Sequence, residues 1–146
     1  MRLLKRFLRD IGSEFIPSDV VNINNKRFTS TIEPPIELPE PVYTGTYLGQ
    51  NRRRFVPSSL FLQRLAQESS THKVWVDRDT AWLFVVGKDI FDENIIKQTD
   101  GVRLGGYCLV MFGTYCVGYG RYETSLERRV VKNLFDLGDF LRREQA

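Results

Sequence analysis

The side chains of this sequence that could do chemistry are mostly cations placed close together. Residues 127–134 read ERRVVKNL, and this segment holds three cations within five positions: Arg128, Arg129 and Lys132. A guanidinium group can grip a phosphate with two parallel hydrogen bonds, and a lysine adds a point charge. The segment is therefore a candidate for contact with a nucleic-acid backbone.

If this segment forms a strand, its side chains alternate between two faces. Arg128 and Lys132 would share one face, and Arg129 would share the other with Asn133, which could read a base edge. A bend or an edge position would instead bring all three cations to one rim. The alternative to RNA contact is ion pairing with nearby acids, namely Glu123, Glu127 or Asp136.

Other cations are also clustered, although the net charge of the chain is only +3. Arg52, Arg53 and Arg54 are consecutive, and Lys88 follows Gly87 at the expected end of a helix, where a cation favours the helix dipole. A further group near the start of the chain comprises Arg2, Lys5, Arg6 and Arg9. Such clusters can meet phosphate, and the alternative is a solvated, solubilising surface.

Residues for catalysis or metal binding are scarce. His72 is the only histidine, and no nucleophile signature accompanies it. Zinc needs about four ligands at recognisable spacing, which one histidine with Cys108 and Cys116 does not provide. The glycines of Gly118-Tyr-Gly120 lie in a strand pattern, where they would let the strand bend or let RNA or another backbone approach. We therefore expect no enzyme activity, no cofactor and no metal.

The first half of the sequence predicts a small α/β module. The expected elements are a helix over 3–11, strands over 20–23, 27–32 and 42–50, and a helix from 57 to about 68. Four prolines in residues 33–41 exclude a helix or a central strand there, so this segment is expected to be an extended connector. The polar run 69–71 marks the expected boundary between two domains, residues 1–71 and 72–146.

The second half predicts many short strands and few helices. A short helix capped by Asp79 or Thr80 should run to Val86, and Trp75 and Trp82 should pack in the core. The expected strands cover residues 73–76, 89–91, 95–98, 107–112, 115–122 and 129–134, before a final helical turn over 137–142. Such a pattern predicts a small, partly closed barrel, and the fold class is α+β.

Several stretches resemble a known family. Residues 73–91, KVWVDRDTAWLFVVGKDIF, are similar to the opening of a PUA domain. Residues 117–120 and 128–144, VGYG and RRVVKNLFDLGDFLRRE, resemble the ending of the ribosome-biogenesis factors commonly called the Nip-seven family, especially its archaeal members. Residues 42–50, VYTGTYLGQ, are similar to that family's crossing between its two domains.

This resemblance implies an N-terminal α/β module followed by a C-terminal PUA-type pseudo-barrel that binds single-stranded U- or AU-rich RNA. It places the RNA contacts on Arg128, Arg129 and Lys132. A further basic position of the family falls on Phe135, where a base could stack on the ring instead. The proline segment 34–41 stands where the family has a helix, so partner contacts of that helix do not carry over.

We therefore expect a non-catalytic RNA-binding factor of ribosome biogenesis and pre-rRNA processing, with Lys88 and residues 52–54 assisting the main site. The alternative is a PUA-type adaptor that recruits an RNA-modification enzyme or the exosome through protein contacts. The expected partners are pre-rRNA and possible exosome or assembly proteins, with no membrane, and the protein should be a monomer. The two cysteines do not resemble a secreted disulfide framework, so an intracellular compartment is expected. It would be the cytoplasm in an archaeal host and the nucleolus in a eukaryotic one.

Overall fold

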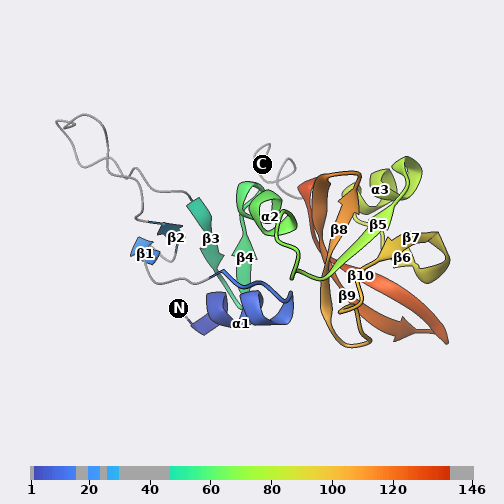
Figure 1. Ribbon diagram of the computed structural model, residues 1–146, viewed down its shortest axis with the longest axis horizontal. Coiled ribbons are helices and arrows are strands. Elements are labelled where there is room, and N and C mark those ends of the chain that lie inside the picture. Colours follow the sequence, from blue (N-terminus) through green and yellow to red (C-terminus); the bar gives the residue numbers. More distant parts are fainter. Residues whose placement is uncertain (1, 16–19, 24–25, 30–46, 139–146) are drawn as a thin grey trace.

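The computed structural model describes residues 2–15, 20–23, 26–29 and 47–138, which form two β-sheets with helices packed against them (Figure 1). The predicted proline connector 33–41 lies outside the described residues. So do parts of the predicted strands 27–32 and 42–50, and most of the predicted final helical turn.

The described residues of the first half form two helices and one antiparallel sheet with the order β1-β2-β3-β4. Its elements are α1 (Arg2–Asp10), β1 (Val20–Ile23), β2 (Lys26–Thr29), β3 (Tyr47–Asn51), β4 (Phe55–Pro57) and α2 (Ser59–Ala66). The apolar residues of α1 recur at helical spacing and are buried, as the sequence predicts. Gly12, with a φ of +77°, ends the turn after α1, and the Ser58 hydroxyl caps α2 by accepting a hydrogen bond from the Phe61 amide at 3.1 Å.

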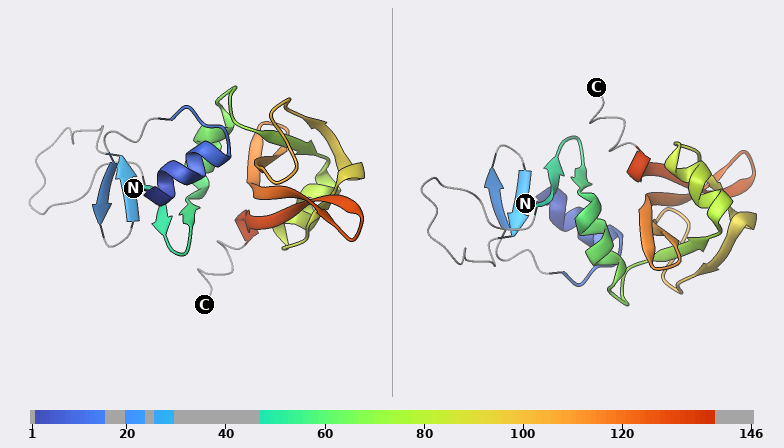
Figure 2. Two further views of the ribbon diagram at one scale, coloured as in Figure 1. Left: turned by 90° about the horizontal axis from the view of Figure 1, so that it is seen from below. Right: turned by 90° about the horizontal axis from the view of Figure 1, so that it is seen from above.

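The second half forms a six-stranded sheet with the order β6-β10-β9-β8-β5-β7, which curls strongly around one helix (Figure 2). Its elements are β5 (Lys73–Val76), α3 (Arg78–Val85), β6 (Ile90–Phe91), the 3-10 helix η1 (Asp92–Asn94), β7 (Ile95–Gln98), β8 (Tyr107–Phe112), β9 (Tyr115–Ser125) and β10 (Arg128–Asp136). β5 and β8 are parallel, and the other pairs in this sheet are antiparallel.

The cap of α3 differs from the prediction. Asp77, the first residue after β5, is extended with φ −76° and ψ 176°, and its carboxylate accepts a hydrogen bond from the Thr80 amide at 2.8 Å. The helix therefore begins two residues before Thr80, and the predicted cap at Asp79 or Thr80 is wrong. A carboxylate suits this place because it satisfies an otherwise unpaired amide of the first helical turn.

Two glycines let β10 lie directly on β9. A Cβ atom on Gly118 would lie 2.1 Å from the carbonyl oxygen of Phe135, and one on Gly120 would lie 2.3 Å from that of Lys132. Gly118 also has a φ of +151°, which side-chain-bearing residues rarely adopt. The expectation that these glycines allow another backbone to approach is therefore confirmed, and that backbone is the chain's own last strand.

Two hydrophobic cores lie on opposite faces of the curled sheet. The inner core lies inside the curl and includes Phe84 of α3 and Val131 of β10. The second core packs α1, β4 and α2 against the other face of β8, β9 and β10, which we call the outer face. Its members from the sheet are Leu109, Met111, Cys116, Tyr119 and Phe135.

Phe135 belongs to this second core. Its side chain is only 7% exposed, and its ring stacks on that of Tyr119 with centroids 6.2 Å apart. Tyr119 in turn meets the ring of Phe7 from α1 edge-on at 5.2 Å. A ring buried in this way cannot receive an RNA base, so the stacking role considered for Phe135 is wrong.

The two tryptophans differ in their surroundings. Trp75 is half-buried and packs against the second core, and its indole N–H donates to the carbonyl of Gly113 at 3.0 Å. Trp82 is 67% exposed on α3. The predicted core position of Trp82 is therefore wrong, because α3 turns a different side, that of Ala81 and Phe84, towards the inner core.

Candidate nucleic-acid interface

The pairing of β10 with β9 decides on which face each predicted cation lies. The register runs without interruption from residue 128 to residue 133 and shifts only after that. Val131 is buried in the inner core, so Arg129, two residues before it, projects to the inner side of the sheet. Arg128 and Lys132 project to the outer face. The three cations are thus divided between two faces, as simple alternation predicts, and no bend gathers them on one rim.

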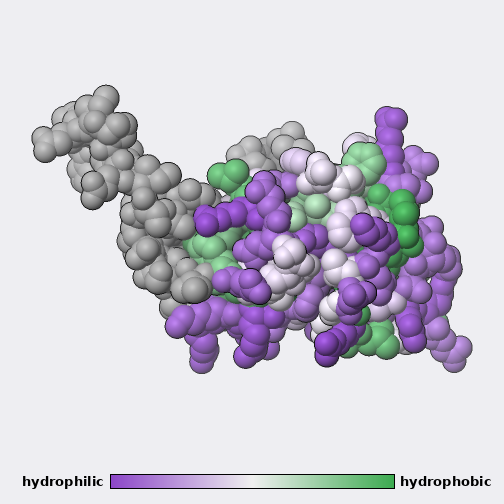
Figure 3. Space-filling view, in the orientation of Figure 1, coloured by the Kyte–Doolittle hydropathy of each residue, from purple (hydrophilic) through white to green (hydrophobic). Residues whose placement is uncertain are grey.

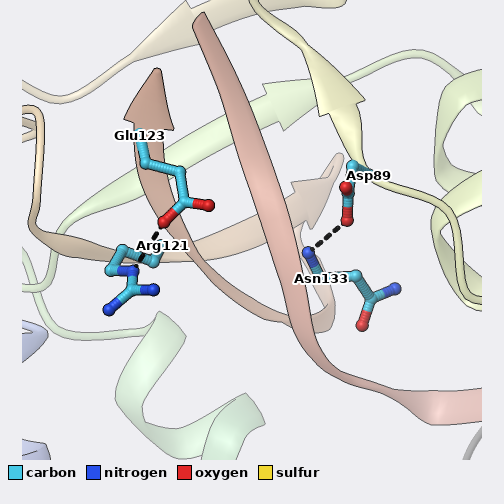
Figure 4. Close-up of polar contacts among 4 residues, drawn as sticks. All are labelled: Asp89, Arg121, Glu123 and Asn133. Atoms are coloured by element: carbon cyan, nitrogen blue, oxygen red, sulfur yellow. Dashed lines mark hydrogen bonds and ion pairs between the residues drawn. The ribbon is translucent and has the colours of Figure 1, made fainter. Parts of the chain in front are cut away.

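A row of three polar residues crosses the outer face. Lys132 on β10 is paired with Arg121 on β9, and Arg121 is paired with Tyr107 on β8. Directly paired residues of antiparallel strands project to the same face, so the three side chains are neighbours. The carboxylate of Glu123, on the same face, lies 2.8 Å from Nε of Arg121 (Figure 4). Sequence reasoning missed Arg121 and Tyr107 because only strand pairing brings them to Lys132.

Arg128 lies at the exposed end of the same face. Its guanidinium carbon lies 4.0 Å from the centroid of the Phe91 ring, and its Nη2 atom lies 2.6 Å from Oε1 of Glu93. The acid that pairs with Arg128 is therefore not one of the three that the sequence suggested. Both members of this pair are exposed, and exposed pairs contribute only about 0–1 kcal/mol, so a phosphate could displace the carboxylate. Among the described residues, Arg129 and Lys132 form no ion pair.

Arg129 stands at the inner rim, beside a tyrosine. The Tyr122 hydroxyl donates a hydrogen bond to Oδ1 of Asp92 at 2.5 Å. Burial and the nearby Asp92 raise the pKa of Tyr122 above its ordinary value, and the Arg129 guanidinium opposes that rise. Arg129 thus interacts with the Tyr122 hydroxyl on the inner side of the sheet and lies away from the row on the outer face.

Asn133 fastens β10 to the end of α3. Its side-chain nitrogen donates to the carbonyl of Phe84 at 2.8 Å and reaches that of Lys88 at 3.4 Å. Its backbone amide donates to Oδ1 of Asp89 at 2.8 Å (Figure 4). These contacts give Asn133 a structural role in place of base reading, and they bring the exposed Lys88 beside β10.

The arginines of residues 52–54 form the turn between β3 and β4, where all three are exposed. Nη2 of Arg54 donates to the carbonyl of Leu134 at 3.3 Å, across 80 positions of sequence. The turn therefore reaches the C-terminal part of β10, and the structure brings this cluster close to the outer face.

The described residues contain no group of three or more His, Cys, Asp or Glu side chains that could hold a metal ion. Burial raises the pKa of the Cys108 and Cys116 thiols to about 12, so both are protonated at neutral pH. Among the described helices, none is long and apolar enough to cross a membrane.

Comparison with known proteins agrees with the shape of the second half. Residues 72–145 match the family model described as the UPF0113 PUA domain. A conserved PUA domain protein from Thermoplasma acidophilum has a similar structure, with a TM-score of 0.62 and 18% identity over 98% of this chain and 91% of that chain. At this identity the likeness shows the fold alone. No curated protein matches the chain significantly. The predicted α+β fold with a PUA-type pseudo-barrel is confirmed.

Proposed function

We propose that this chain, which belongs to the UPF0113 PUA-domain family, is a non-catalytic RNA-binding factor of ribosome biogenesis and pre-rRNA processing. The PUA domain indicates RNA binding in general. The finer role and the preference for single-stranded U- or AU-rich RNA rest on the resemblance of residues 42–50, 117–120 and 128–144 to the Nip-seven family. With them we propose a division into residues 1–71 and 72–146 and a monomeric state.

The observation that carries the proposal is the row of Lys132, Arg121 and Tyr107 on the outer face, with Arg128 beyond it. The two arginines supply planar donor groups that match phosphate oxygens, and Lys132 adds an exposed charge. A tyrosine next to such cations, at the end of the row, offers a ring on which a base of any type can stack. Cations beside an aromatic ring are the combination that binds single strands through backbone charge and base stacking.

A binding measurement tests this site. The fluorescence polarisation of labelled U-rich, A-rich and C-rich single-stranded RNA is followed at two salt concentrations. The outer-face variant Arg128→Gln/Lys132→Gln should bind U-rich RNA more weakly and with a smaller salt dependence. Each lost phosphate contact lowers the slope of log K against log salt by about 0.7 for single strands. Arg129→Gln, on the inner rim, should lose less.

The matched control removes two charges elsewhere. Arg78→Gln/Lys97→Gln, on α3 and β7, changes the net charge by the same amount and should leave the affinity near that of the wild type. If the control and the outer-face variant lose affinity equally, the binding is a general charge effect and the assigned site is wrong. If the wild type binds none of the three RNAs, the proposed function is wrong.

The adaptor function remains a second candidate because of an exposed apolar patch around α3. Trp82, Leu83, Val86 and Phe112 are each between 44% and 67% exposed. Three of them, Trp82, Leu83 and Phe112, line a shallow hollow. Hydrophobic side chains gather at the α3 side of the molecule, at the right of Figure 3. Exposed apolar patches of this kind often mark protein contacts. Recovery of an RNA-modification enzyme or of exosome subunits by the wild type but not by Trp82→Ser, without RNA affinity, would favour the adaptor.

A further inference from the structure

A cleft lies where α1, the turn between β3 and β4, and the outer face of β8 and β9 meet. Its volume is about 140 Å³. Ordinary small-molecule sites have roughly 300–1,000 Å³, so the cleft is too small for a dinucleotide cofactor or a comparable ligand. Its volume suits one part of a nucleotide in a longer chain, such as a single base.

The lining of the cleft combines aromatic rings with guanidinium groups. Tyr107 and Tyr119 line it from the sheet, and Arg53 and Arg54 line it from the turn. Burial raises the pKa of Tyr119 to about 12, with the charge of Arg54 opposing the rise, so its hydroxyl stays protonated at neutral pH. Tyr107 is only half-buried, so part of this residue stays exposed where it lines the cleft.

The charge balance of the cleft favours an anion. Among the described residues of the lining, Arg6 of α1 completes a set of three guanidinium groups, and Asp10 is the one carboxylate. The Asp10 carboxylate already forms two ion pairs. Its Oδ2 atom lies 3.9 Å from Nε of Arg6, and its Oδ1 atom lies 3.6 Å from Nε of Arg9. Arg53 forms no ion pair within the described part of the chain, so its charge is available to a ligand.

The cleft continues into the basic side of α1. Arg2, Lys5, Arg6 and Arg9 line a shallow hollow on this helix, and Arg6 belongs to both the hollow and the cleft. Side chains three and four positions apart lie about 5–6 Å from one another on a helix surface, so these cations form a stripe along it. Hydrophilic side chains gather along α1 at the lower left of Figure 3.

The other end of the cleft leads to the proposed RNA site. Tyr107 lines the cleft and is also the first member of the row that continues through Arg121 to Lys132. Arg54 lines the cleft and is bonded to the carbonyl of Leu134, on β10. The cations of β10, the cleft and α1 thus lie along one path that crosses both halves of the chain, and the carboxylates on this path, Glu123 and Asp10, are paired with arginines.

We infer that a single RNA strand held by the outer face of β10 continues into this cleft, places one base between the tyrosines and the arginines, and follows the stripe of α1. The inference rests on the proposed RNA binding and adds the first half of the chain to the binding surface. The strand's phosphates meet the guanidinium groups of Arg6 and Arg53, and a base stacks on the ring of Tyr107.

The test compares two lengths of U-rich RNA by fluorescence polarisation over a range of salt concentrations. Lengths of about 6 and about 18 nucleotides bracket the roughly 4–16 that a small single-strand-binding domain covers. The cleft variant Arg6→Gln/Arg53→Gln should weaken binding of the long RNA and lower its salt slope by about 1.4, which corresponds to two phosphate contacts. It should leave binding of the short RNA unchanged.

Two further variants separate the possible results. Arg2→Gln/Lys5→Gln, on α1, should reproduce the effect on the long RNA, and the control Arg78→Gln/Lys97→Gln should not. All the substituted side chains are exposed, and circular dichroism verifies that each variant is folded. If the cleft variant binds the long RNA like the control while Arg128→Gln/Lys132→Gln binds weakly, the inference fails and the proposed function stands. If the wild type binds neither RNA, both fail.

Discussion

At the residue scale, the position of β10 depends on glycines in its neighbour β9. Gly118 and Gly120 face carbonyl oxygens of β10 at distances that exclude any side chain. The backbone of Lys132 is one of the groups that come this close. The place of a candidate RNA-binding cation is thus fixed by residues that have no side chain at all.

The substitution Gly118→Ala should therefore destabilise the protein strongly. Its Cβ would lie 2.1 Å from the Phe135 oxygen at a φ of +151°, so both the backbone and β10 must shift. We expect a loss of about 2–5 kcal/mol in the free energy of unfolding, combining backbone strain with overpacking. Urea unfolding followed by circular dichroism measures this loss.

Gly113 provides the control, since its φ is +59° and no atom of the described part of the chain lies within 4 Å of its ideal Cβ. Gly113→Ala should cost only the conformational term, about 1–2 kcal/mol. If the two variants lose equal free energy of unfolding, the close approach of β10 is not the reason that position 118 requires glycine.

At the element scale, α3 follows the strand β5 in the chain and is hydrogen-bonded to the last strand, β10. Asp77 caps its first turn, and Asn133 of β10 bonds to carbonyls at its other end. The helix therefore positions Lys88, which follows it directly. Its outward side carries Trp82 and Leu83, so one short helix serves both the core and the surface.

The cap makes a prediction about acid stability. The backbone amide of Thr80 is the main cause that lowers the pKa of Asp77 below its ordinary value of 3.8. A lowered folded pKa means that the unfolded state binds the proton more readily. The contribution of Asp77 is therefore present above that ordinary value and is lost as the pH falls through the folded one.

Thermal unfolding between about pH 6 and about pH 3 checks this prediction. Asp77→Ala should lower the midpoint at neutral pH, because the Thr80 amide loses its partner. Asp77→Asn keeps a capping oxygen without a titrating group, so it should retain most of the neutral-pH midpoint and show a smaller fall in acid. If the unfolding midpoint of Asp77→Asn falls in acid as much as that of the wild type, Asp77 is not the source of the acid sensitivity.

At the scale of the whole molecule, the outer face of the sheet is both a core and a candidate binding surface. Tyr119 and Phe135 are covered by α1 and β4, whereas Lys132 and Arg121 continue the same strands into solvent. The two halves of the chain therefore share one hydrophobic core. Because of this shared core, we expect them to unfold together.

Phe7→Ala tests this coupling. Phe7 lies in α1 and contacts the rings of Phe55 and Tyr119, with centroids 5.5 and 5.2 Å away. Removing a buried ring of this size costs about 3–5 kcal/mol. Trp75 and Trp82 both lie in the second half, so tryptophan fluorescence reports its unfolding. In Phe7→Ala, the urea midpoint followed by tryptophan fluorescence should fall together with the urea midpoint followed by circular dichroism.

Leu60→Ala is the control, because that side chain on α2 is 64% exposed and its loss should cost about 0.5 kcal/mol or less. A Phe7→Ala protein whose fluorescence midpoint equals that of the wild type would show two independently unfolding halves.

The sequence by itself determined the features that follow from local patterns. The apolar spacing in α1, the strand pattern of residues 107–112 and the glycines of residues 118–120 were interpreted correctly, because periodicity and steric limits act over a few residues. The cationic segment of β10 was also visible. Alternation alone already placed Arg128 and Lys132 on a different face from Arg129.

Only the tertiary structure decided which of these residues meet. Strand pairing placed Arg121 and Tyr107 beside Lys132, and the packing of α1 on the sheet buried Phe135 and formed the cleft with Arg53. Trp82 was misplaced for the same reason, since an apolar residue type does not say which side of a short helix is covered. Contacts between residues far apart in the chain depend on register and on packing across the sheet, and no local pattern encodes either of them.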